Sequence, residues 1–478
     1  MDITQSEKDW AKTISVAEKL IPLIGRLYRD RGVVLSCNGR SLIDRSPIEI
    51  VKAHRAARHR DGVPMPLEDT LAIVETLSGL EVSPCKVDVA RVRAQFEGSA
   101  LSSMRDYLLS SIPVGVVNGA AEQRTDVVLY GFGRIGRLVA RIILGHGGNG
   151  RGLRLRAIVV RRAGDGDLVK RASLLRRDSV HGKFAGTITL DEKRNVIVAN
   201  GTEIQVIYSD DPATIDYTQW GISNALLIDN TGRWRDEPGL SQHLSAKGVA
   251  RVLLTAPGKS PLKNIVYGLN HATIEDNDTI LSAASCTTNA IAPVLKVLND
   301  RFGVEHGHVE TVHSYTNDQN LIDNFHKGDR RGRSAPLNMV IAETGAAQAV
   351  TKALPELMGK LTGNAIRVPT PNVSMAILNL TLATDVDRLA VNMALRDAAL
   401  ASDLSNQIDF IESPEVVSSD FVGSTHAGIV DGLATIAQGR HAVVYVWYDN
   451  EFGYSHQVVR VAKEMAGMRL RHIPASNR

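Results

Sequence analysis

The sequence predicts an α/β protein made of an all-helical N-terminal region, a domain with a mostly parallel sheet and an α+β domain with a mixed or antiparallel sheet. Three observations predict this order. Helix-start signals dominate residues 1–120, short β-branched runs alternate with helical stretches from Asp126, and strands with a period of two prevail after about residue 285. A chain of 478 residues is also too long for one core, because a domain averages about 150 residues.

The expected N-terminal helices begin at proline residues. Pro47 precedes IEIVKAHRAARH and Pro66 precedes LEDTLAIVETLSG, and proline is favoured in the first turn of a helix. Apolar residues recur at steps of four and three from Trp10 to Ile24, and we expect Pro22 to kink or interrupt this helix. Basic and acidic residues nearly balance here, so the region is a poor arm for nucleic acid.

The composition excludes several classes of protein. The net charge of +3 is too small to indicate a nucleic-acid or membrane partner, and no run of about 18 apolar residues predicts a membrane span. The first residues lack the pattern of a signal peptide. Three widely separated cysteines favour neither a disulfide framework nor a metal site, so we expect a cytoplasmic protein in a reducing compartment.

The run VVLYGFGRIGRLVARIIL places Gly131, Gly133 and Gly136 between a predicted strand and an amphipathic helix. Glycines at this spacing allow a tight turn and let a pyrophosphate approach the amides at the start of the helix. An ordinary glycine-rich turn is the alternative. The flanking strand and helix favour a dinucleotide-binding Rossmann domain.

The end of the next strand predicts which dinucleotide binds. In LRLRAIVVRRAGDGD the strand ends at Arg161 and Arg162, where an enzyme that uses NAD usually presents an acid to the ribose 2′-hydroxyl. Arginine suits the 2′-phosphate of NADP instead. Asp165 and Asp167 follow in an expected loop and could fold back to the ribose. The sequence therefore favours NADP, or the use of both NADP and NAD.

Cys286 stands among hydroxyl residues at the start of a predicted helix, in SAASCTTNAIAPVLKVLND. Free amides and the positive end of the helix dipole favour a thiolate over a thiol there. The alternative is a small buried cysteine near a helix cap. His313 ends a later predicted strand, in VETVHSYTNDQN, from which an imidazole could take the thiol proton as a general base. A histidine on a strand is otherwise most often structural.

Six motifs in order resemble phosphorylating glyceraldehyde-3-phosphate dehydrogenase: GFGRIG, SCTTN, HSYT, ETGAA, IRVPTPNVS and WYDNEFGYS. The resemblance covers residues 125–475. With its N-terminal region, the whole chain resembles longer bacterial variants that carry an N-terminal extension. It implies a helical extension at 1–120, a Rossmann domain at 121–284 completed by a C-terminal helix at 450–478, and a catalytic domain at 285–449.

The resemblance implies the chemistry of the site. Cys286 would be the nucleophile that adds to D-glyceraldehyde 3-phosphate, and His313 the base that also steadies the oxyanion. Hydride transfer would leave a thioester, which inorganic phosphate attacks to release 1,3-bisphosphoglycerate. The direction, glycolytic or gluconeogenic, stays open. No metal is implied.

The resemblance also implies two phosphate sites. The attacking phosphate would contact the following four residues: Ser285, Thr287, Thr344 and Gly345. The substrate phosphate would contact Thr316, Arg367 and a further arginine, for which Arg331 is assigned and Arg333 is the alternative. The cofactor would lie along these residues: Arg134, Ile135, Thr231, Gly232, Thr255, Asn450 and Tyr454.

Some residues depart from the family pattern. The acid expected at the ribose is missing, Ile377 stands where Asp is usual, and Ala427-Gly428 stand where a serine pair is common. The family implies a homotetramer, which the N-terminal region could alter. Two other functions are alternatives to this dehydrogenase activity: that of erythrose-4-phosphate dehydrogenase, and that of a regulatory or binding protein on a dehydrogenase scaffold.

Overall fold

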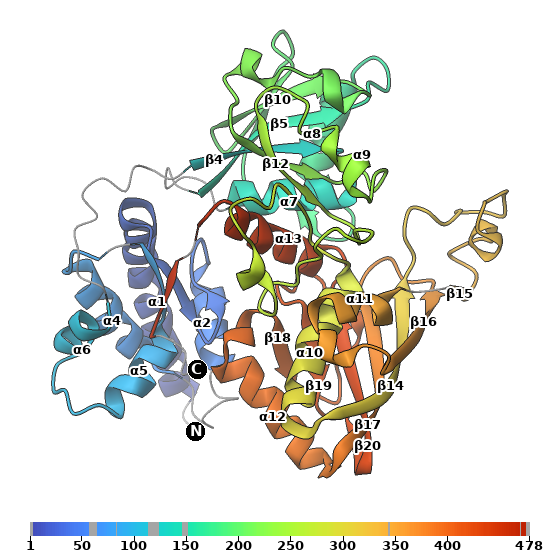
Figure 1. Ribbon diagram of the computed structural model, residues 1–478. Coiled ribbons are helices and arrows are strands. Elements are labelled where there is room, and N and C mark those ends of the chain that lie inside the picture. The colour runs from blue at the N-terminus through green and yellow to red at the C-terminus, as the bar shows by residue number, and fades with distance from the viewer. Residues whose placement is uncertain are drawn as a thin grey trace.

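Figure 1 shows the computed structural model, in which the N-terminal region lies beside the parts that follow it in the chain. The structure describes residues 3–56, 65–82, 84–112, 124–145, 152–342, 345–468 and 470–474. None of the helices in these ranges combines the length and the apolar character needed to cross a lipid bilayer.

The N-terminal region contains a four-stranded sheet in the order β2-β1-β3-β21. Its strands are β1 (Val34–Cys37), β2 (Arg40–Ser41), β3 (Cys85–Asp88) and β21 (Arg471–Ile473). Its helices are α1 (Ile3–Arg31), α2 (Pro47–Ala56), α4 (Leu67–Ser78), α5 (Val89–Glu97) and α6 (Met104–Ser111). One core joins residues of these helices to alternate residues of the sheet, including Leu35 and Val87.

The prediction of an all-helical N-terminal region is therefore wrong. The strands are two to four residues long, too short for an alternating pattern to stand out. Asn38 and Gly39 both have positive φ and form the tight turn between β1 and β2, which is the strongest short hairpin signal in a sequence. The fourth strand, β21, comes from the other end of the chain, so no local sequence pattern could place it in this sheet.

The first helix also differs from its prediction. α1 continues through Pro22, which costs one backbone hydrogen bond, and the packing of Leu20, Ile24 and Leu27 in the core holds the helix on both sides. Trp10 remains 42% exposed. Only part of the predicted apolar stripe of α1 is therefore buried in the core.

The next part is a doubly wound sheet in the order β13-β12-β11-β4-β5-β10-β9-β8. The six parallel strands are β4 (Arg124–Tyr130), β5 (Gly152–Val160), β10 (Thr202–Tyr208), β11 (Ala225–Asp229), β12 (Val249–Leu254) and β13 (Ile280–Ser282). The antiparallel edge consists of β8 (Ile188–Asp191) and β9 (Val196–Ala199). The helices are α7 (Arg134–Gly145), α8 (Asp167–Arg176) and α9 (Glu237–Ser241). The predicted mostly parallel sheet is confirmed.

The C-terminal helix α13 (Phe452–Met465) packs in the same core as α7. It is shorter than the expected range of 450–478, because Gly467 adopts positive φ and the amide of Met468 donates to the carbonyl of Lys463 at 2.9 Å, which closes the helix. The chain then enters β21, so its end belongs to the N-terminal sheet.

A third large sheet has seven strands in the order β15-β16-β14-β17-β20-β19-β18, and its mixed character agrees with the prediction. A small two-stranded sheet pairs β6 (Arg177–Asp178) with β7 (Gly182–Lys183). The strands are β14 (Val304–Ser314), β15 (Val340–Ala342), β16 (Leu361–Val368), β17 (Ser374–Asp387), β18 (Ile408–Ile411), β19 (Gly428–Asp431) and β20 (Ile436–Tyr448). Three helices, α10 (Cys286–Phe302), α11 (Ala346–Ala353) and α12 (Arg388–Ala401), share its core. The long α10 follows β13 directly and carries the chain from the parallel sheet to this one (Figure 1).

Candidate active site

Cys286 is the first residue of α10. The hydroxyl of Ser285, at the N-cap, accepts a hydrogen bond from the amide of Thr288 at 3.0 Å. Ala284 has a φ of 55°, a strained value for a residue with a side chain, and its carbonyl accepts a hydrogen bond from the Tyr454 hydroxyl at 2.8 Å. This bend turns the chain from β13 into the helix and places the thiol at the helix N-terminus.

His313 lies next to the end of β14, and its Nε2 is 3.6 Å from the Sγ of Cys286. The two residues are 27 positions apart in the chain. They meet because α10 begins and β14 ends at the same junction between the two sheets. A contact at this distance allows the thiol proton to pass to the imidazole.

Two groups compete for the other nitrogen of His313. Nδ1 lies 2.7 Å from the carbonyl of Ser314 and 2.6 Å from Nη1 of Arg367. The register of β14 and β16 pairs His313 directly with Arg367. Nδ1 can donate to the carbonyl or accept from the guanidinium, but it cannot do both. Only the first arrangement leaves the lone pair of Nε2 free to act as a base towards Cys286.

Burial sets the charge state of this pair. Burial, and then the charge of Arg367, lower the pKa of His313 to about 3. Burial raises the pKa of the Cys286 thiol, although Arg367 and hydrogen bonds from Thr287 lower it. The pair therefore rests as a thiol and a neutral imidazole near pH 7, and not as the thiolate that the helix start alone favours, because burial outweighs the helix N-terminus.

Three residues predicted to hold the substrate phosphate gather around one carboxylate, Asp318. The hydroxyl of Thr316 donates to Asp318, and Arg331 forms an ion pair with it. Burial raises the pKa of Asp318, but the Thr316 hydrogen bond and the charges of Arg331 and Arg367 outweigh burial and lower it overall. Arg333, the alternative to Arg331, instead pairs with Asp323 at 3.0 Å. The structure brings Thr316, Arg331 and Arg367 together and keeps Arg333 apart.

The residues predicted for the attacking phosphate lie at the starts of two packed helices. Ser285 and Thr287 begin α10, and Gly345 is the N-cap of α11 with open space where a side chain would stand. The hydroxyl of Thr287 lies 3.0 Å from that of Tyr448. Thr344 lies outside the described residues. Helix N-termini present free amides that suit an anion.

A cavity of about 940 Å³ lies above the glycine loop. Gly131 has a φ of 90°, and a Cβ there would stand 2.9 Å from the Thr231 side chain. A Cβ on Gly136 would meet the carbonyl of Gly131 at 2.5 Å, whereas Gly133 faces open space. These are the roles expected of the three glycines: a turn, a close packing of helix on strand, and room for a ligand. The loop fits a dinucleotide.

Cations surround this cavity. The lining includes the predicted Arg161 and Arg162 and two arginines that sequence reasoning missed, Arg171 and Arg233. Arg162 lies over the ring of Tyr208 at 5.3 Å, and Arg233 lies over Trp234 at 4.8 Å. Asp210 also lines the cavity.

The acids that could have folded back do not replace the missing ribose acid. Asp167 does turn back, and it accepts hydrogen bonds from the amide of Ala163 at 3.0 Å and from Arg171 at 2.9 Å. That ion pair neutralises it, and neither Asp167 nor Asp165 lines the cavity.

The other predicted cofactor residues occupy three places. Arg134 and Ile135 begin α7, where their amides face the loop, but the Arg134 side chain is bound to Asp178 at 2.8 Å and to Glu451. Thr231 and Thr255 both hydrogen-bond to Asp229 at the ends of their strands, and Gly232 follows Thr231 with positive φ.

Asn450 and Tyr454 lie on the side of the cysteine. The Oδ1 of Asn450 accepts a hydrogen bond from the Ser374 hydroxyl at 2.9 Å, which leaves the amide nitrogen as a donor. Tyr454 is buried, and its hydroxyl contacts the residue before Ser285. Both residues flank the start of α13, close to Cys286.

Two family descriptions match the chain. Residues 125–237 match "Glyceraldehyde 3-phosphate dehydrogenase, NAD binding domain", and residues 285–450 match the C-terminal domain of the same family. The chain belongs to the glyceraldehyde-3-phosphate dehydrogenase family.

Relatives of this family differ in how much of the chain they match. A "Glyceraldehyde-3-phosphate dehydrogenase-like protein" of Pseudomonas aeruginosa is 63% identical over 94% of this chain and 98% of its own length. Glyceraldehyde-3-phosphate dehydrogenases of Zymomonas mobilis and Bacillus subtilis are 39% and 40% identical, and each matches 71% of this chain over 98% of its own length. The Pseudomonas protein therefore shares the N-terminal region, and the other two match only the remainder.

The departures from the family pattern have local structural consequences. Ile377 lies in β17 between Glu310 and Tyr445, on a sheet face that the core helices do not cover. A Cβ on Gly428 would stand 2.8 Å from the carbonyl of Ala290, so glycine permits β19 to approach α10 closely.

Sequence reasoning missed several residues that support the site. Four of them hold the side chains of predicted site residues: Asp318, Tyr448, Asp178 and Glu451. Asp318 ends the motif HSYTND, and Tyr448 and Glu451 lie in the motif WYDNE. The residues Arg171 and Arg233 had no signal of their own, because only the folded sheet brings them to the cavity.

Proposed function

We propose that this protein oxidises D-glyceraldehyde 3-phosphate to 1,3-bisphosphoglycerate, with inorganic phosphate and NADP or NAD, through a thioester on Cys286. The observation that carries the proposal is the 3.6 Å contact between Sγ of Cys286 and Nε2 of His313 at the N-terminus of α10. The contact joins a nucleophile, a base and an oxyanion site in one place.

Nucleophilic attack begins with a proton transfer. Nε2 of His313 takes the thiol proton, and the sulfur adds to the aldehyde carbon. The amide of Cys286 then donates to the oxygen that gains negative charge, and the imidazolium of His313 passes its proton to that oxygen. Asn450 offers its amide nitrogen to a carboxamide, which would hold the nicotinamide ring beside the cysteine.

The bound dinucleotide supplies the ring that accepts hydride from this adduct. His313 removes the proton from the adduct oxygen as the carbon loses hydride, and the carbon becomes a thioester. Inorganic phosphate, held by Ser285, Thr287, Thr344 and Gly345, attacks the thioester carbon. The carbon–sulfur bond breaks, the acyl phosphate leaves, and Cys286 recovers its thiol by taking a proton from His313.

The substrate phosphate would also prepare the base. A phosphate bound by Arg331 and Arg367 draws the Arg367 guanidinium away from Nδ1 of His313. Nδ1 then donates to the Ser314 carbonyl, which is the arrangement that frees Nε2 for the thiol proton. Binding of the correct substrate thus favours the competent tautomer.

Replacing Arg331 with Gln tests this phosphate site. We expect the KM for glyceraldehyde 3-phosphate to rise about tenfold or more, because a charged hydrogen bond to phosphate is lost. Turnover of unphosphorylated D-glyceraldehyde should not change. Arg333→Gln is the matched control, since Arg333 pairs with Asp323 and should affect neither substrate. Equal effects of the two substitutions on both aldehydes would contradict the assignment.

The arginines at the ribose support the use of NADP. Arg161 and Arg162 line the cavity with Arg171 and Arg233, and the one acid that turns back, Asp167, is already paired. A 2′-phosphate would find several donors there, whereas a 2′-hydroxyl would find no free carboxylate at the end of β5. The acid among the lining residues, Asp210, follows β10 instead.

The double substitution of Arg161 and Arg162 with Gln should lower kcat/KM for NADP by about a hundredfold or more, since two charged hydrogen bonds are lost and each contributes about 1.5–3 kcal/mol. The value for NAD should change little. Arg194→Gln is the control, because Arg194 pairs with Asp191 and Glu203 far from the cavity lining. A wild-type preference for NAD, or an equal loss for both cofactors, would refute the proposal.

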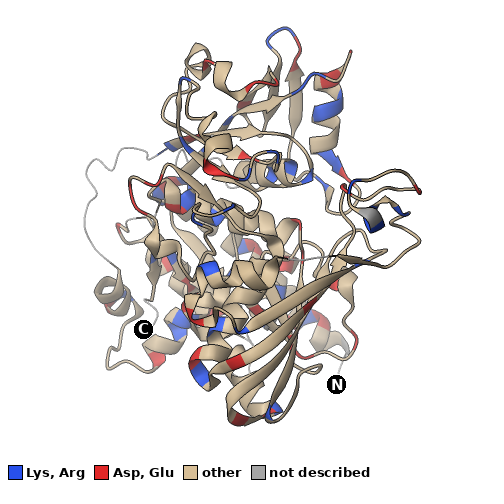
Figure 2. Cartoon of the chain, turned by 45° about the vertical axis from the view of Figure 1, so that its right-hand side comes forward, with Lys and Arg blue, Asp and Glu red and all other residues tan. Residues whose placement is uncertain are grey.

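We also propose a homotetramer. The segment between β14 and β15 projects from the body of the protein (Figure 1, Figure 2) and exposes large apolar side chains, including Leu321 at 74% and Phe325 at 92%. Exposed apolar side chains of this size mark an association surface. A second copy of the chain would cover them.

The rival activity is that of erythrose-4-phosphate dehydrogenase, which shares the cysteine and histidine chemistry. Its thioester is hydrolysed, so phosphate is not a substrate. Steady-state rates with glyceraldehyde 3-phosphate and with erythrose 4-phosphate, each with and without phosphate, separate the two. A binding or regulatory role without catalysis would leave all four rates at background.

A further inference from the structure

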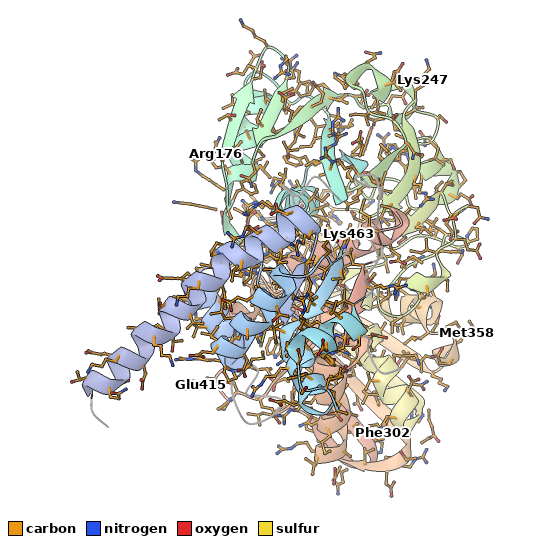
Figure 3. The ribbon with its side chains drawn as sticks, turned by 90° about the vertical axis from the view of Figure 1, so that its left-hand side faces the viewer. Arg176, Lys247, Phe302, Met358, Glu415 and Lys463 are labelled. Atoms are coloured by element: carbon orange, nitrogen blue, oxygen red, sulfur yellow. The ribbon has the colours of Figure 1, made fainter. Side chains whose placement is uncertain are left out.

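We call the region between the N-terminal sheet and α13 the seam. Both of its sides carry cations that form no ion pair with a described residue. The chain leaves α13 at Met465 and enters β21 at Arg471, so the last turn of the helix stays close to the sheet. Figure 3 shows Lys463 on this helix, where the N-terminal helices meet the rest of the protein.

The sheet contributes Lys86 to the seam. Residues of β3 alternate between the two faces of the sheet: Cys85 and Val87 are buried in the core, and Lys86 points to the opposite face. His472 of β21 stands beside Lys86 in register and shares its face. That face is the one the N-terminal core does not cover.

The helix contributes Arg460 and Lys463. These residues are three apart and thus lie on one side of α13, and both are half-buried, whereas their neighbours Val458, Val459 and Val461 are fully buried in the other core. Arg460 donates only to neutral groups, the carbonyl of Thr425 at 3.2 Å and Oε1 of Gln457 at 2.8 Å. The side-chain ammonium groups of Lys86 and Lys463 have no hydrogen bond or ion pair with any described residue.

These cations lie close enough to disturb one another. Burial, and then the charges of Lys86 and Arg460, lower the pKa of Lys463 to about 8. Burial and Arg460 lower the pKa of Lys86 to about 8 as well, although Glu464 opposes them. Further charged or titratable groups lie around this cluster. His472 stands near Lys86 with Arg91 and Asp403, and Arg460 faces Tyr267 and His426, the latter with Asp409 and Arg40. Positive charge prevails, and burying like charges together is unfavourable unless an anion joins them.

We propose that Lys86, Arg460 and Lys463 form a binding site for a small anion with at least two negative charges, of the phosphate-ester or polyphosphate class. Two ammonium groups and a guanidinium supply the donors that such an anion needs. The three cations make a half-buried cluster within one seam, which suits a small molecule better than the backbone of a nucleic acid.

This site is distinct from the catalytic phosphate sites and does not rest on the reaction proposed above. Tyr454, beside the cysteine, and Lys463 are separated by roughly 14 Å along the axis of α13, at 1.5 Å per residue. Neither Lys86 nor Lys463 lines the dinucleotide cavity.

Calorimetric titration with inorganic pyrophosphate tests the proposal, with saturating NADP present to fill the dinucleotide cavity. The proteins compared are the wild type, the seam variant Lys86→Gln with Lys463→Gln, and a variant with Arg331→Gln and Arg367→Gln that lacks the catalytic phosphate cations. We expect one site to persist in the last variant. The seam variant should bind at that site at least about tenfold more weakly, because charged hydrogen bonds are lost.

Two further variants control for folding and for general loss of charge. Lys247→Gln removes an exposed lysine that Figure 3 shows away from Lys463, and it should bind as the wild type does. If the double seam variant fails to fold, Lys463→Gln alone should still weaken binding, and Lys463→Arg should retain it. Wild-type affinity in the seam variants, or the absence of any site once Arg331 and Arg367 are replaced, would overturn the proposal.

Stability without the anion gives a second readout. The folded pKa of Lys463, about 8, lies below its ordinary value of 10.5, so this lysine destabilises the fold below pH 8 and the cost disappears as the pH rises from about 8 to 10.5. Lys463→Gln should therefore raise the midpoint of thermal unfolding at pH 7, and the gain should vanish near pH 10. Pyrophosphate should raise the midpoint of the wild type at pH 7 but not that of Lys463→Gln. A lower midpoint for Lys463→Gln at pH 7, or an equal response to pyrophosphate, would contradict the proposal.

Discussion

Cys286→Ser should reduce kcat for glyceraldehyde 3-phosphate oxidation by on the order of 10⁴-fold or more, since replacing an enzyme's nucleophile removes the covalent route entirely. A serine hydroxyl at this position has the same hydrogen-bonding partners but a far higher pKa than a thiol. His313, with its own pKa lowered to about 3, is too weak a base to ionise it. Initial rates of reduced cofactor formation at saturating phosphate measure the loss.

The control for this substitution is Cys85→Ala. Cys85 is buried in the N-terminal core, far in the fold from the junction where Cys286 lies, so its replacement should leave kcat unchanged even if it lowers the stability of that core. Alkylation with iodoacetamide should inactivate the wild type and Cys85→Ala alike. Turnover by Cys286→Ser within tenfold of the wild type would exclude the thioester.

His313→Asn should lower kcat by about 10²- to 10⁴-fold, the usual contribution of a positioned general base. Asparagine keeps a polar side chain at the end of β14 but cannot take the thiol proton. Alkylation of Cys286 should also shift to higher pH, because burial already raises the pKa of the thiol and no neighbouring base remains. Rates of iodoacetamide inactivation from pH 5 to 10 measure this shift.

The pKa of His313 determines how kcat/KM should change at acid pH. His313 acts as a neutral imidazole, and its pKa of about 3 means that this form is lost only as the pH falls towards 3. Protonation of His313 should therefore cause little loss of kcat/KM between pH 7 and 5. His308→Asn, on the exposed part of the same strand, is the matched control and should leave both profiles unchanged. An acid limb near pH 6.5 that His313→Asn abolishes would show that the imidazole is not held neutral.

Local patterns predicted the parts of the site that depend on one stretch of chain. The spacing of Gly131, Gly133 and Gly136 between a strand and a helix fixes a loop whose geometry follows from the absence of side chains. The position of Cys286 at a helix start likewise follows from Ser285 and the helix after it. The meeting of Cys286 with His313 needed the order of motifs along the chain, since spacing in sequence does not determine a contact in space.

Features that depend on distant segments could not be predicted from the sequence. The N-terminal sheet includes β21, which pairs with β3 only after the chain has passed through both of the larger sheets. The competition between Ser314 and Arg367 for His313 depends on the register of β14 and β16. The pairing of Asp167 with Arg171 is local, because the two residues lie four apart on α8, but sequence reasoning placed Asp167 in a loop and so missed the pair.

The most direct test of the proposed thioester is a rapid-mixing experiment without phosphate. Enzyme saturated with oxidised cofactor is mixed with excess glyceraldehyde 3-phosphate, and reduced cofactor is followed by absorbance. The account predicts a burst of one equivalent per active cysteine, then a slow steady rate that inorganic phosphate accelerates. Steady turnover at full rate with no phosphate, or no burst in the wild type under conditions where phosphate supports turnover, would contradict it.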